Sequence, residues 1–381
     1  MIIFIISLAL LGAYYFLIHY YHQSWKQVPS FGNNAIHNFV AAEKISVIVP
    51  ARNEEAVIEQ CILSLLQQSY PKELLEIIIV DDYSTDGTAD IVQRYHNQGI
   101  QLLSLQKRNI SAQPIIAFKK KAIETAIQAA TGTLIVTTDA DCIFHKSWIQ
   151  AIAAFHQHSK AVFIVSPVKI KPANTLLSIF QSIDFAILQG ITAASVHKKF
   201  HSMCNGANLG YEKIIFYEVN GFENIDHIAS GDDMLLMHKV YSKHPNGIAY
   251  LNAPESIVET LPAPNWKAFI NQRIRWASKT GQYKDKRIVF VLALVYILNL
   301  CLFILLAGSI VQPGWLLFFA VAVFYKTLIE WNFVKEVLKY FNLQHLMQWF
   351  PLFQPLHIAY TVIAGFLGSF GSYDWKGRKV K

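Results

Sequence analysis

Two aspartates that flank one small residue, Asp139 and Asp141, are the first candidates for chemistry in this sequence. They follow an apolar run at residues 134–138, so we expect a loop after a buried strand, with both carboxylates pointing the same way. Hard oxygen ligands suit Mg²⁺ or Mn²⁺, and a metal held there could neutralise a departing diphosphate. The alternative is a solvated turn, and the position after a strand favours the metal site.

A second acidic pair, Asp81 and Asp82, follows the apolar run at residues 77–80. The residues that come next, 84–87, are Ser-Thr-Asp-Gly, which are typical of a turn that caps a helix. Both interpretations can hold together, with the loop capping a helix while Asp82 accepts hydrogen bonds from a nucleobase.

A third pair, Asp232 and Asp233, follows Gly231 and precedes an apolar helix. A carboxylate at this position could simply cap the helix and complement its dipole. Alternatively, one of the two is a general base that removes the proton from an attacking hydroxyl group.

The segment 266–281 is amphipathic and contains Gln272, Arg275 and Trp276 just before an apolar region. It is typical of a basic helix at a membrane surface. In addition, Arg275 could neutralise a diphosphate and Trp276 could line a sugar site.

The elements that position these residues alternate between strands and helices. Strands are predicted at residues 45–50, 77–80, 101–105 and 134–138, and helices at 53–66, with Asn53 as the cap, 88–95 and 118–130. This order predicts an α/β domain with a mostly parallel sheet and helices on both faces. Ligands bind such folds beyond the carboxyl ends of the strands, where Arg52, Glu54 and the first two acidic pairs fall. Like charges gathered at one edge repel, so stability alone explains them poorly.

Three stretches without charged residues predict a membrane protein: residues 1–23, 288–325 and 340–373. The chain is 53% hydrophobic and only 15% charged, against about 25% in soluble domains. The first stretch could be a signal peptide, but its length and its lack of a basic start favour an anchor. The second is expected to be a hairpin of two spans that turns at residues 312–314. The third, broken by two prolines, is either a broken span or an interfacial segment.

The formal net charge of +7 would also suit a nucleic-acid binder, but no nucleic-acid motif is visible. The basic residues fall near predicted membrane boundaries, as expected on the cytoplasmic side. The four cysteines have neither metal-ligand spacing nor the spacing of a disulfide framework, and reduced thiols suit a cytoplasmic domain.

The ordered set of motifs resembles the family 2 glycosyltransferases with the GT-A fold. The resemblance is to the membrane-bound branch, with cellulose, chitin and hyaluronan synthases and ceramide glucosyltransferases. It covers residues 45–276 and rests on five pieces: Val49-Pro50-Ala51-Arg52-Asn53-Glu54-Glu55, Val80-Asp81-Asp82 through Thr88, Asp139-Ala140-Asp141, Gly231-Asp232-Asp233 and Gln272-x-x-Arg275-Trp276.

This resemblance implies inversion by direct displacement and assigns roles to residues. Asp233 would be the base, beside Asp232 where the family usually has Glu, and Lys119 would bind the donor, after Phe118 where the family usually has Gly. The remaining expected roles are donor and nucleotide binding by Pro50, Arg52, Glu54, Asp81, Asp82, Asp139, Gln272, Arg275 and Trp276, metal binding by Asp141 with Asp139, and the acceptor side by Asn205, Gly206 and Asn208.

The predicted layout is an anchor, a linker, a GT-A domain, an interfacial segment, a membrane region and a basic tail, at residues 1–23, 24–42, 43–263, 264–287, 288–373 and 374–381. We expect a bacterial inner-membrane enzyme with a cytoplasmic catalytic domain. It would move a sugar from a nucleotide sugar, a UDP-sugar first of all, to a lipid or lipid-linked acceptor. The alternatives are a processive polysaccharide synthase, an inactive nucleotide-sugar-binding subunit and a transporter subunit. Residues 340–373 are not expected to cross the membrane once.

Overall fold

The computed structural model describes residues 2–106, 117–200, 203–279, 285–370, 373–375 and 378–380. The chain forms two compact units. We call the first the sheet unit, which comprises Val28–Lys171 and Ser195–Leu261. The second is the helical unit, which comprises Met1–Gln27, Pro172–Ala194 and Pro262–Lys381.

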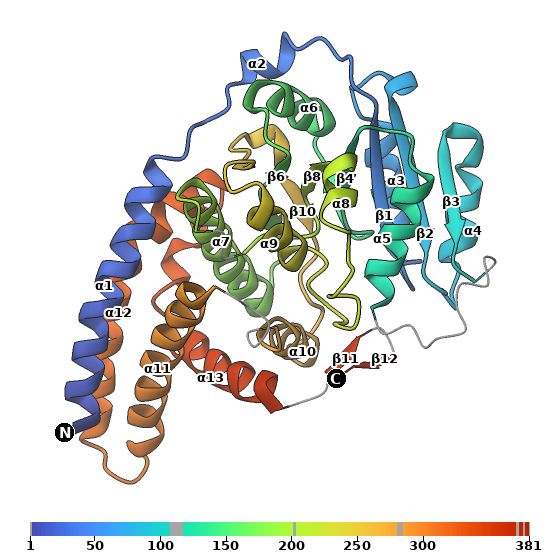
Figure 1. Ribbon diagram of the computed structural model, residues 1–381. Helices are drawn as coiled ribbons and strands as arrows, with labels where there is room; N and C mark the ends of the chain where they lie inside the picture. The colour runs from blue at the N-terminus through green and yellow to red at the C-terminus, as the bar shows by residue number, and fades with distance from the viewer. Residues whose placement is uncertain are drawn as a thin grey trace. The chain divides into compact units, whose positions relative to one another are not determined.

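A seven-stranded mixed sheet with the order β3-β2-β1-β4-β8-β6-β9 is the core of the sheet unit. A smaller sheet has the order β5-β10-β7. Their strands are β1 Ile45–Ala51, β2 Leu75–Asp81, β3 Ile100–Ser104, β4 Leu134–Thr137, β5 Ile143–Phe144, β6 Phe163–Val165, β7 Val168–Ile170, β8 Leu209–Glu212, β9 Ile248–Tyr250 and β10 Val258–Thr260. The first four strands are parallel to one another, whereas β8 is antiparallel to both β4 and β6. Figure 1 shows β1, β2 and β3 side by side.

The strand register brings the predicted site residues to one edge. Ala51, the last residue of β1, pairs with Asp81, the last residue of β2. Thr137, the last residue of β4, pairs with Leu209, the first residue of the antiparallel β8. The loop before β8 therefore meets the loops after β1, β2 and β4.

The helices of the sheet unit follow the predicted alternation in its first half. They are α2 Asn33–His37, α3 Ile58–Leu66, α4 Thr88–Arg94, α5 Phe118–Ala129, α6 Trp148–Ser159, α8 Lys213–Glu218 and α9 Met234–Lys243. The predicted cap of α3 is wrong, because the Asn53 side chain accepts a bond from the Thr85 N–H (2.9 Å) and α3 starts only at Ile58.

The helical unit is built from three separated parts of the chain. Its helices are α1 Ile2–Lys26, most of α7 Leu176–His197, α10 Trp266–Ala277, α11 Lys286–Gly308, α12 Trp315–Tyr340 and α13 Gln354–Phe370. A 3₁₀ helix spans Gln344–Trp349, and the short strands Tyr373–Trp375 and Arg378–Val380 pair antiparallel. Helix α1 packs along α11 and α12 (Figure 1).

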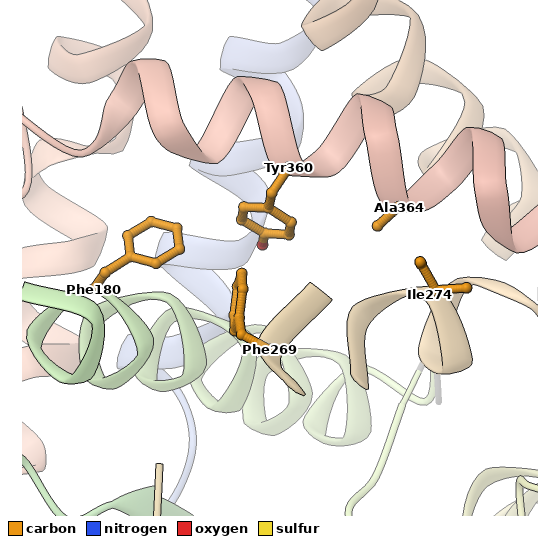
Figure 2. Packing of buried hydrophobic residues seen from close by; sticks show 5 residues of the cluster. All are labelled: Phe180, Phe269, Ile274, Tyr360 and Ala364. Carbon is orange, nitrogen blue, oxygen red and sulfur yellow. The ribbon is translucent and has the colours of Figure 1, made fainter. Parts of the chain in front are cut away.

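An aromatic cluster joins α7, α10 and α13 within the helical unit (Figure 2). The rings of Phe180, Phe269 and Tyr360 meet edge to face, with centroids 5.3 to 5.7 Å apart. Edge-to-face pairs of this kind stabilise beyond the area that they bury. The cluster therefore holds α10, the helix that carries the Gln-x-x-Arg-Trp motif, against its two neighbours.

The structure refines the predicted membrane segments. Within the described residues, four helices are long and apolar enough to cross a membrane: α1, α7, α11 and α12. The predicted hairpin is present, with the turn between Gly308 and Trp315. Helix α12, however, continues to Tyr340, well past residue 325. The prediction missed α7, because Asp184 interrupts its apolar sequence.

The boundaries of the two compact units also differ from those of the predicted segments. Residues 28–42, expected as a linker, belong to the sheet unit, where the Phe31 N–H donates to the Asn252 carbonyl (2.8 Å). Residues 172–194 lie in the helical unit instead of the expected continuous domain. Of the predicted basic tail, residues 376, 377 and 381 lie outside the described residues, as do residues 280–284 of the predicted interfacial segment.

Candidate active site

The loops after β1 and β2 are joined by hydrogen bonds along their length. The Glu54 N–H donates to Thr88 Oγ1 (2.8 Å), and the Gly87 N–H donates to Glu55 Oε2 (2.9 Å). Asp86 Oδ1 accepts from the Thr88 N–H (3.1 Å), as expected of a residue at the start of α4. These bonds give the predicted nucleotide-binding loops a defined shape before any ligand binds.

Arg52 holds the second loop by its main chain. Its Nη1 atom donates to the carbonyl oxygens of Asp82 (2.8 Å) and Tyr83 (2.7 Å). Asp82 is buried, with 2% of its surface exposed, and its N–H donates to the Ala51 carbonyl (2.8 Å), directly after Pro50. Asp81 Oδ1 accepts from the Ser84 N–H (3.1 Å). The predicted nucleotide-binding residues from β1 and β2 therefore form one connected group.

Lys119 lies between the acidic pairs. Its ammonium forms ion pairs with Asp139 Oδ1 (2.7 Å), after β4, and with Asp232 Oδ2 (3.1 Å), before α9. Burial acts to lower the pKa of Lys119, but the carboxylates of Asp139, Asp232 and Asp233 outweigh it and raise that pKa above its ordinary value. Two acidic clusters that are about 90 residues apart in sequence are thus joined by one cation.

Asp233 takes the predicted cap position of α9, while its role as a base remains a prediction. Its Oδ1 atom accepts from the Met234 N–H (2.7 Å) and caps α9, and its Oδ2 atom accepts from the Gly206 N–H (3.2 Å). A side chain at Gly206 would come within 3.1 Å of Asp232 Oδ2 and 3.4 Å of Lys119 Nζ. Glycine therefore lets the loop before β8 approach these charged groups closely.

Asp141 is held by a neutral group, since its Oδ2 atom accepts from the Thr260 hydroxyl (3.1 Å). Within the described residues, no group of three His, Cys, Asp or Glu side chains could hold a metal ion. Mg²⁺ commonly binds one or two carboxylates together with substrate phosphates and water. The residues present, Asp139 and Asp141, therefore fit a metal that arrives with a diphosphate.

The loop before β8 contains two predicted acceptor-side residues, Asn205 and Asn208, whose surroundings differ. Asn205 Oδ1 accepts from the Ala207 N–H (2.9 Å), and Asn205 is partly exposed. Asn208, in contrast, has no exposed surface. Its Nδ2 atom donates to the carbonyls of Pro167 and Ser256 (2.7 Å each), and its Oδ1 atom accepts from the Trp148 indole (3.0 Å). The Asn208 side chain thus ties four segments together beneath the site.

The motif residues Gln272, Arg275 and Trp276 lie on α10 in the helical unit, each partly buried. Their predicted contacts with the donor remain predictions. Between them, Arg273 is 4% exposed and pairs with Asp184 of α7 (2.6 Å). Its guanidinium carbon lies 4.2 Å from the centre of the Trp276 ring, within the range of a cation–π contact.

Three residues with structural roles were not found from the sequence: Thr260, which bonds to Asp141 in the sheet unit, and Asp184 and Tyr360, which support α10 in the helical unit. Asp184 had a visible signal, because it is the one charged residue in the otherwise apolar stretch of α7. The Tyr360 hydroxyl, which donates to Asp184 Oδ1 (2.6 Å), had none.

A seven-stranded mixed sheet with acidic loops at one edge defines the class as a GT-A type α/β protein. Two family models match the chain: glycosyl transferase family 2 over residues 46–218, and glycosyl transferase family group 2 over residues 134–367. The second match covers more than half of the sequence. The chain belongs to the family 2 glycosyltransferases.

The names of curated relatives describe them as glycosyltransferases or sugar transferases. The probable glycosyltransferase YdaM of Bacillus subtilis is 28% identical over 270 residues, which cover 66% of this chain and 61% of YdaM. A Methanococcus voltae enzyme, named dolichyl N-acetyl-alpha-D-glucosaminyl phosphate 3-beta-D-2,3-diacetamido-2,3-dideoxy-beta-D-glucuronosyltransferase, is 43% identical over 68 residues. That match covers 17% of this chain and 21% of the enzyme. The chain therefore spans less than two thirds of the length of these relatives.

A solved structure shares the fold over nearly the whole chain. The mannosyltransferase PcManGT from Pyrobaculum calidifontis, in complex with GDP-Man and Mn²⁺, superposes with a TM-score of 0.58 at 19% identity. The match covers 97% of this chain and 99% of PcManGT.

Proposed function

We propose that this chain transfers a sugar from a nucleotide-diphosphate sugar to an acceptor hydroxyl, with inversion at the anomeric carbon. The observation that carries the proposal is the convergence of Asp139, Asp232 and Asp233 around Lys119, at the carboxyl edge of a GT-A sheet. Family membership supports the same reaction. The likeness to a structure with GDP-Man and Mn²⁺ supports a nucleotide-sugar donor.

In this mechanism the chain's own groups orient the reactants and move one proton. Asp233 is held by two backbone N–H groups, and its carboxylate takes the proton from the attacking acceptor hydroxyl. The new bond to the anomeric carbon forms as the bond to the diphosphate breaks, and the leaving diphosphate keeps the electron pair. Asp139 and Asp141 are the residues that would hold a divalent metal, which supplies neutralisation of the diphosphate charge when bound. The loops that contain Glu54 and Asp82 bind the nucleoside.

Chain continuity supports a membrane arrangement with three spans. Helix α7 has the length and apolarity of a span, but β4 and β6 precede it and β8 follows it in the same sheet. A single crossing by α7 would put paired strands on opposite sides of the bilayer. We therefore count α1, α11 and α12 as the spans. The N-terminus is then outside, with the sheet unit and the chain after α12 in the cytoplasm, where nucleotide sugars are made.

The acceptor is proposed to be a lipid or a lipid-linked sugar, in the synthesis of cell-envelope glycans or glycolipids. Three spans, counted among the described residues, leave little room for a sugar-wide channel, which a processive synthase needs. Helix α13, with 17 residues, is not among the candidate spans and suits an interfacial position. The name of the Methanococcus voltae relative also includes a dolichyl-linked acceptor.

The test of the chemistry uses the full chain in detergent micelles with radiolabelled UDP- and GDP-sugars and Mn²⁺. We expect hydrolysis or transfer that stops with chelator, returns with Mn²⁺ or Mg²⁺, and disappears in Asp233→Asn. The matched control is Asp90→Asn, which makes the same change at an exposed aspartate of α4. Full activity in excess chelator, or in Asp233→Asn, would overturn the mechanism.

The test of the acceptor adds membrane lipid extract. A labelled product in the organic phase that carries one added sugar supports the proposal. A long water-soluble polymer would instead establish the processive alternative.

A further inference from the structure

Lys119 neutralises two of the three carboxylates around it by direct contact. Its ammonium lies 2.7 Å from Asp139 and 3.1 Å from Asp232, and its side chain is 20% exposed. Asp233 is held differently, by the backbone N–H groups of Gly206 and Met234. Removing Lys119 would therefore leave Asp139 and Asp232 as like charges at close range, without their shared cation.

The two aspartates of the Asp139-Ala140-Asp141 motif are in unequal environments. Asp141 accepts a bond from a neutral hydroxyl, that of Thr260, whereas Asp139 is paired with the Lys119 ammonium. A divalent cation attracted to Asp139 would approach an existing positive charge, and like charges at close range repel. A diphosphate changes this balance, because its oxygens offer Lys119 a new anionic partner.

We propose that Lys119 is a positioning residue that couples metal binding to nucleotide binding at this site. In the free protein its ammonium holds Asp139 toward Asp232 and keeps metal affinity low. When the diphosphate binds, Lys119 pairs with it and leaves Asp139 to the metal. This inference rests on the proposed function, because it assumes the same donor site.

The coupling has a thermodynamic consequence. If a nucleotide diphosphate raises the affinity for a metal, the metal must raise the affinity for the nucleotide by the same factor. Lys119 also screens the acidic pair before α9, so it prevents a metal from settling between Asp139 and Asp232 without a donor. Both effects depend on the charge of the residue at position 119 and not on its length.

The experiment measures Mn²⁺ binding to the full chain in detergent by electron paramagnetic resonance of free Mn²⁺, without nucleotide and with saturating UDP or GDP. Protein-free nucleotide titrations account for the Mn²⁺ that the nucleotide itself binds. The variants are Lys119→Gln, which removes the charge, and Lys119→Arg, which keeps it. The matched control is Lys121→Gln on the same helix, since Lys121 pairs with Glu124 outside the site.

In the wild type we expect nucleotide to strengthen Mn²⁺ binding by at least about tenfold, which corresponds to ~1.4 kcal/mol. Lys119→Gln should bind Mn²⁺ without nucleotide about tenfold more tightly than the wild type, and the nucleotide-dependent gain should shrink accordingly. Lys119→Arg and Lys121→Gln should resemble the wild type.

Two results would overturn the inference. One is a Lys119→Gln variant that is folded, judged by its thermal unfolding midpoint, and binds Mn²⁺ no more tightly than the wild type. The other needs no variant: a wild type whose Mn²⁺ affinity is the same with and without nucleotide. If the wild type bound no nucleotide at all, the proposed function would fail as well. If it turned over donors with metal while Lys119→Gln showed unchanged Mn²⁺ affinity, only this inference would fail.

Discussion

Asn208 is predicted from the sequence to bind the acceptor, whereas its surroundings in the structure favour a structural role. The resemblance assigns Asn208 to the acceptor side, yet its side chain has no exposed surface and makes three hydrogen bonds. Substitution Asn208→Ala would remove the partner of the Trp148 indole N–H and of the Ser256 carbonyl. The Pro167 carbonyl keeps a partner, the Val258 N–H at 3.1 Å.

The expected cost follows from these two groups. A buried polar group left without a partner costs about 1–3 kcal/mol, so Asn208→Ala should destabilise the protein by about 2–6 kcal/mol. That is a large share of a total stability of roughly 5–15 kcal/mol. At about 2–4 °C for each kcal/mol in a domain of this size, the unfolding midpoint should fall by between roughly 4 and 24 °C.

The assay is thermal unfolding of the full chain in detergent, together with sugar transfer at a temperature where the variant is folded. Asn97→Ala, at an exposed position of the sheet unit, is the matched control and should leave the midpoint unchanged. In a Trp148→Phe background, Asn208→Ala should cost about 1–3 kcal/mol less, because the indole donor is already gone. Transfer lost in Asn208→Ala with an unchanged midpoint would refute the structural role and support direct contact with the acceptor.

Three further predictions concern other parts of the molecule. His156 lies between Glu43 (2.8 Å) and Glu212 (3.2 Å), and the hydrogen bond with Glu43 raises the pKa of His156 above its ordinary value although burial opposes it. The stability that this histidine adds should be fully present below its ordinary pKa and be lost as the pH rises through the raised pKa. His156→Gln should therefore flatten the dependence of the unfolding midpoint on pH above about pH 6.5. Asp184→Asn breaks an ion pair whose partners are each 4% exposed, so it should destabilise by about 3–5 kcal/mol, while replacing Asp184 and Arg273 together by Leu and Met should cost less in the same unfolding assay. A cysteine added at the carboxyl end of a cysteine-free chain should resist an impermeant thiol reagent in intact cells, and labelling there would contradict the three-span arrangement.

The first half of the fold was predictable because its signals are local. Each of the strands β1, β2 and β4 is a short, mostly apolar run that ends at a polar cluster, and buried parallel strands have this pattern. The pairs Asp81/Asp82 and Asp139/Asp141 fall at the ends of such runs, so their meeting at one edge follows from the alternation of strands and helices. The register of Ala51 with Asp81 agrees with this prediction.

The second half was not predictable in the same way. Strands β6, β7, β9 and β10 have three residues each, too few to show any periodicity. The antiparallel entry of β8, which brings Gly206 to Asp233, depends on pairing between distant segments. The helical unit likewise combines three separate parts of the chain, and no local pattern indicates that α7 belongs with it.

Two adjacent lysines of α5 also show what the sequence alone cannot predict, namely which side chain points into the site. Lys119 pairs with the site carboxylates, whereas Lys120 is 1% exposed and donates to the carbonyls of Ile225 (2.6 Å) and Ile228 (2.8 Å). The two side chains leave α5 about 100° apart, as consecutive residues of a helix must. The sequence cannot assign either direction without the position of the helix, and here only the resemblance selected Lys119.

The charged pair within α12 shows that charges in an apolar helix can be structural when hydrogen bonds and ion pairs satisfy them. An ionisable residue inside a span is by default a hint of a substrate or ion pathway. Lys326, however, pairs with Glu330 one turn away (2.7 Å) and donates to Gln354 of α13 (2.8 Å). Glu330 also accepts from Gln354 (2.5 Å) and from the Tyr14 hydroxyl of α1. The four side chains are buried, and their charges sum to zero. They join α1, α12 and α13 by directional contacts, which apolar packing alone does not provide. These polar contacts therefore help to fix how the helices of this unit pack together.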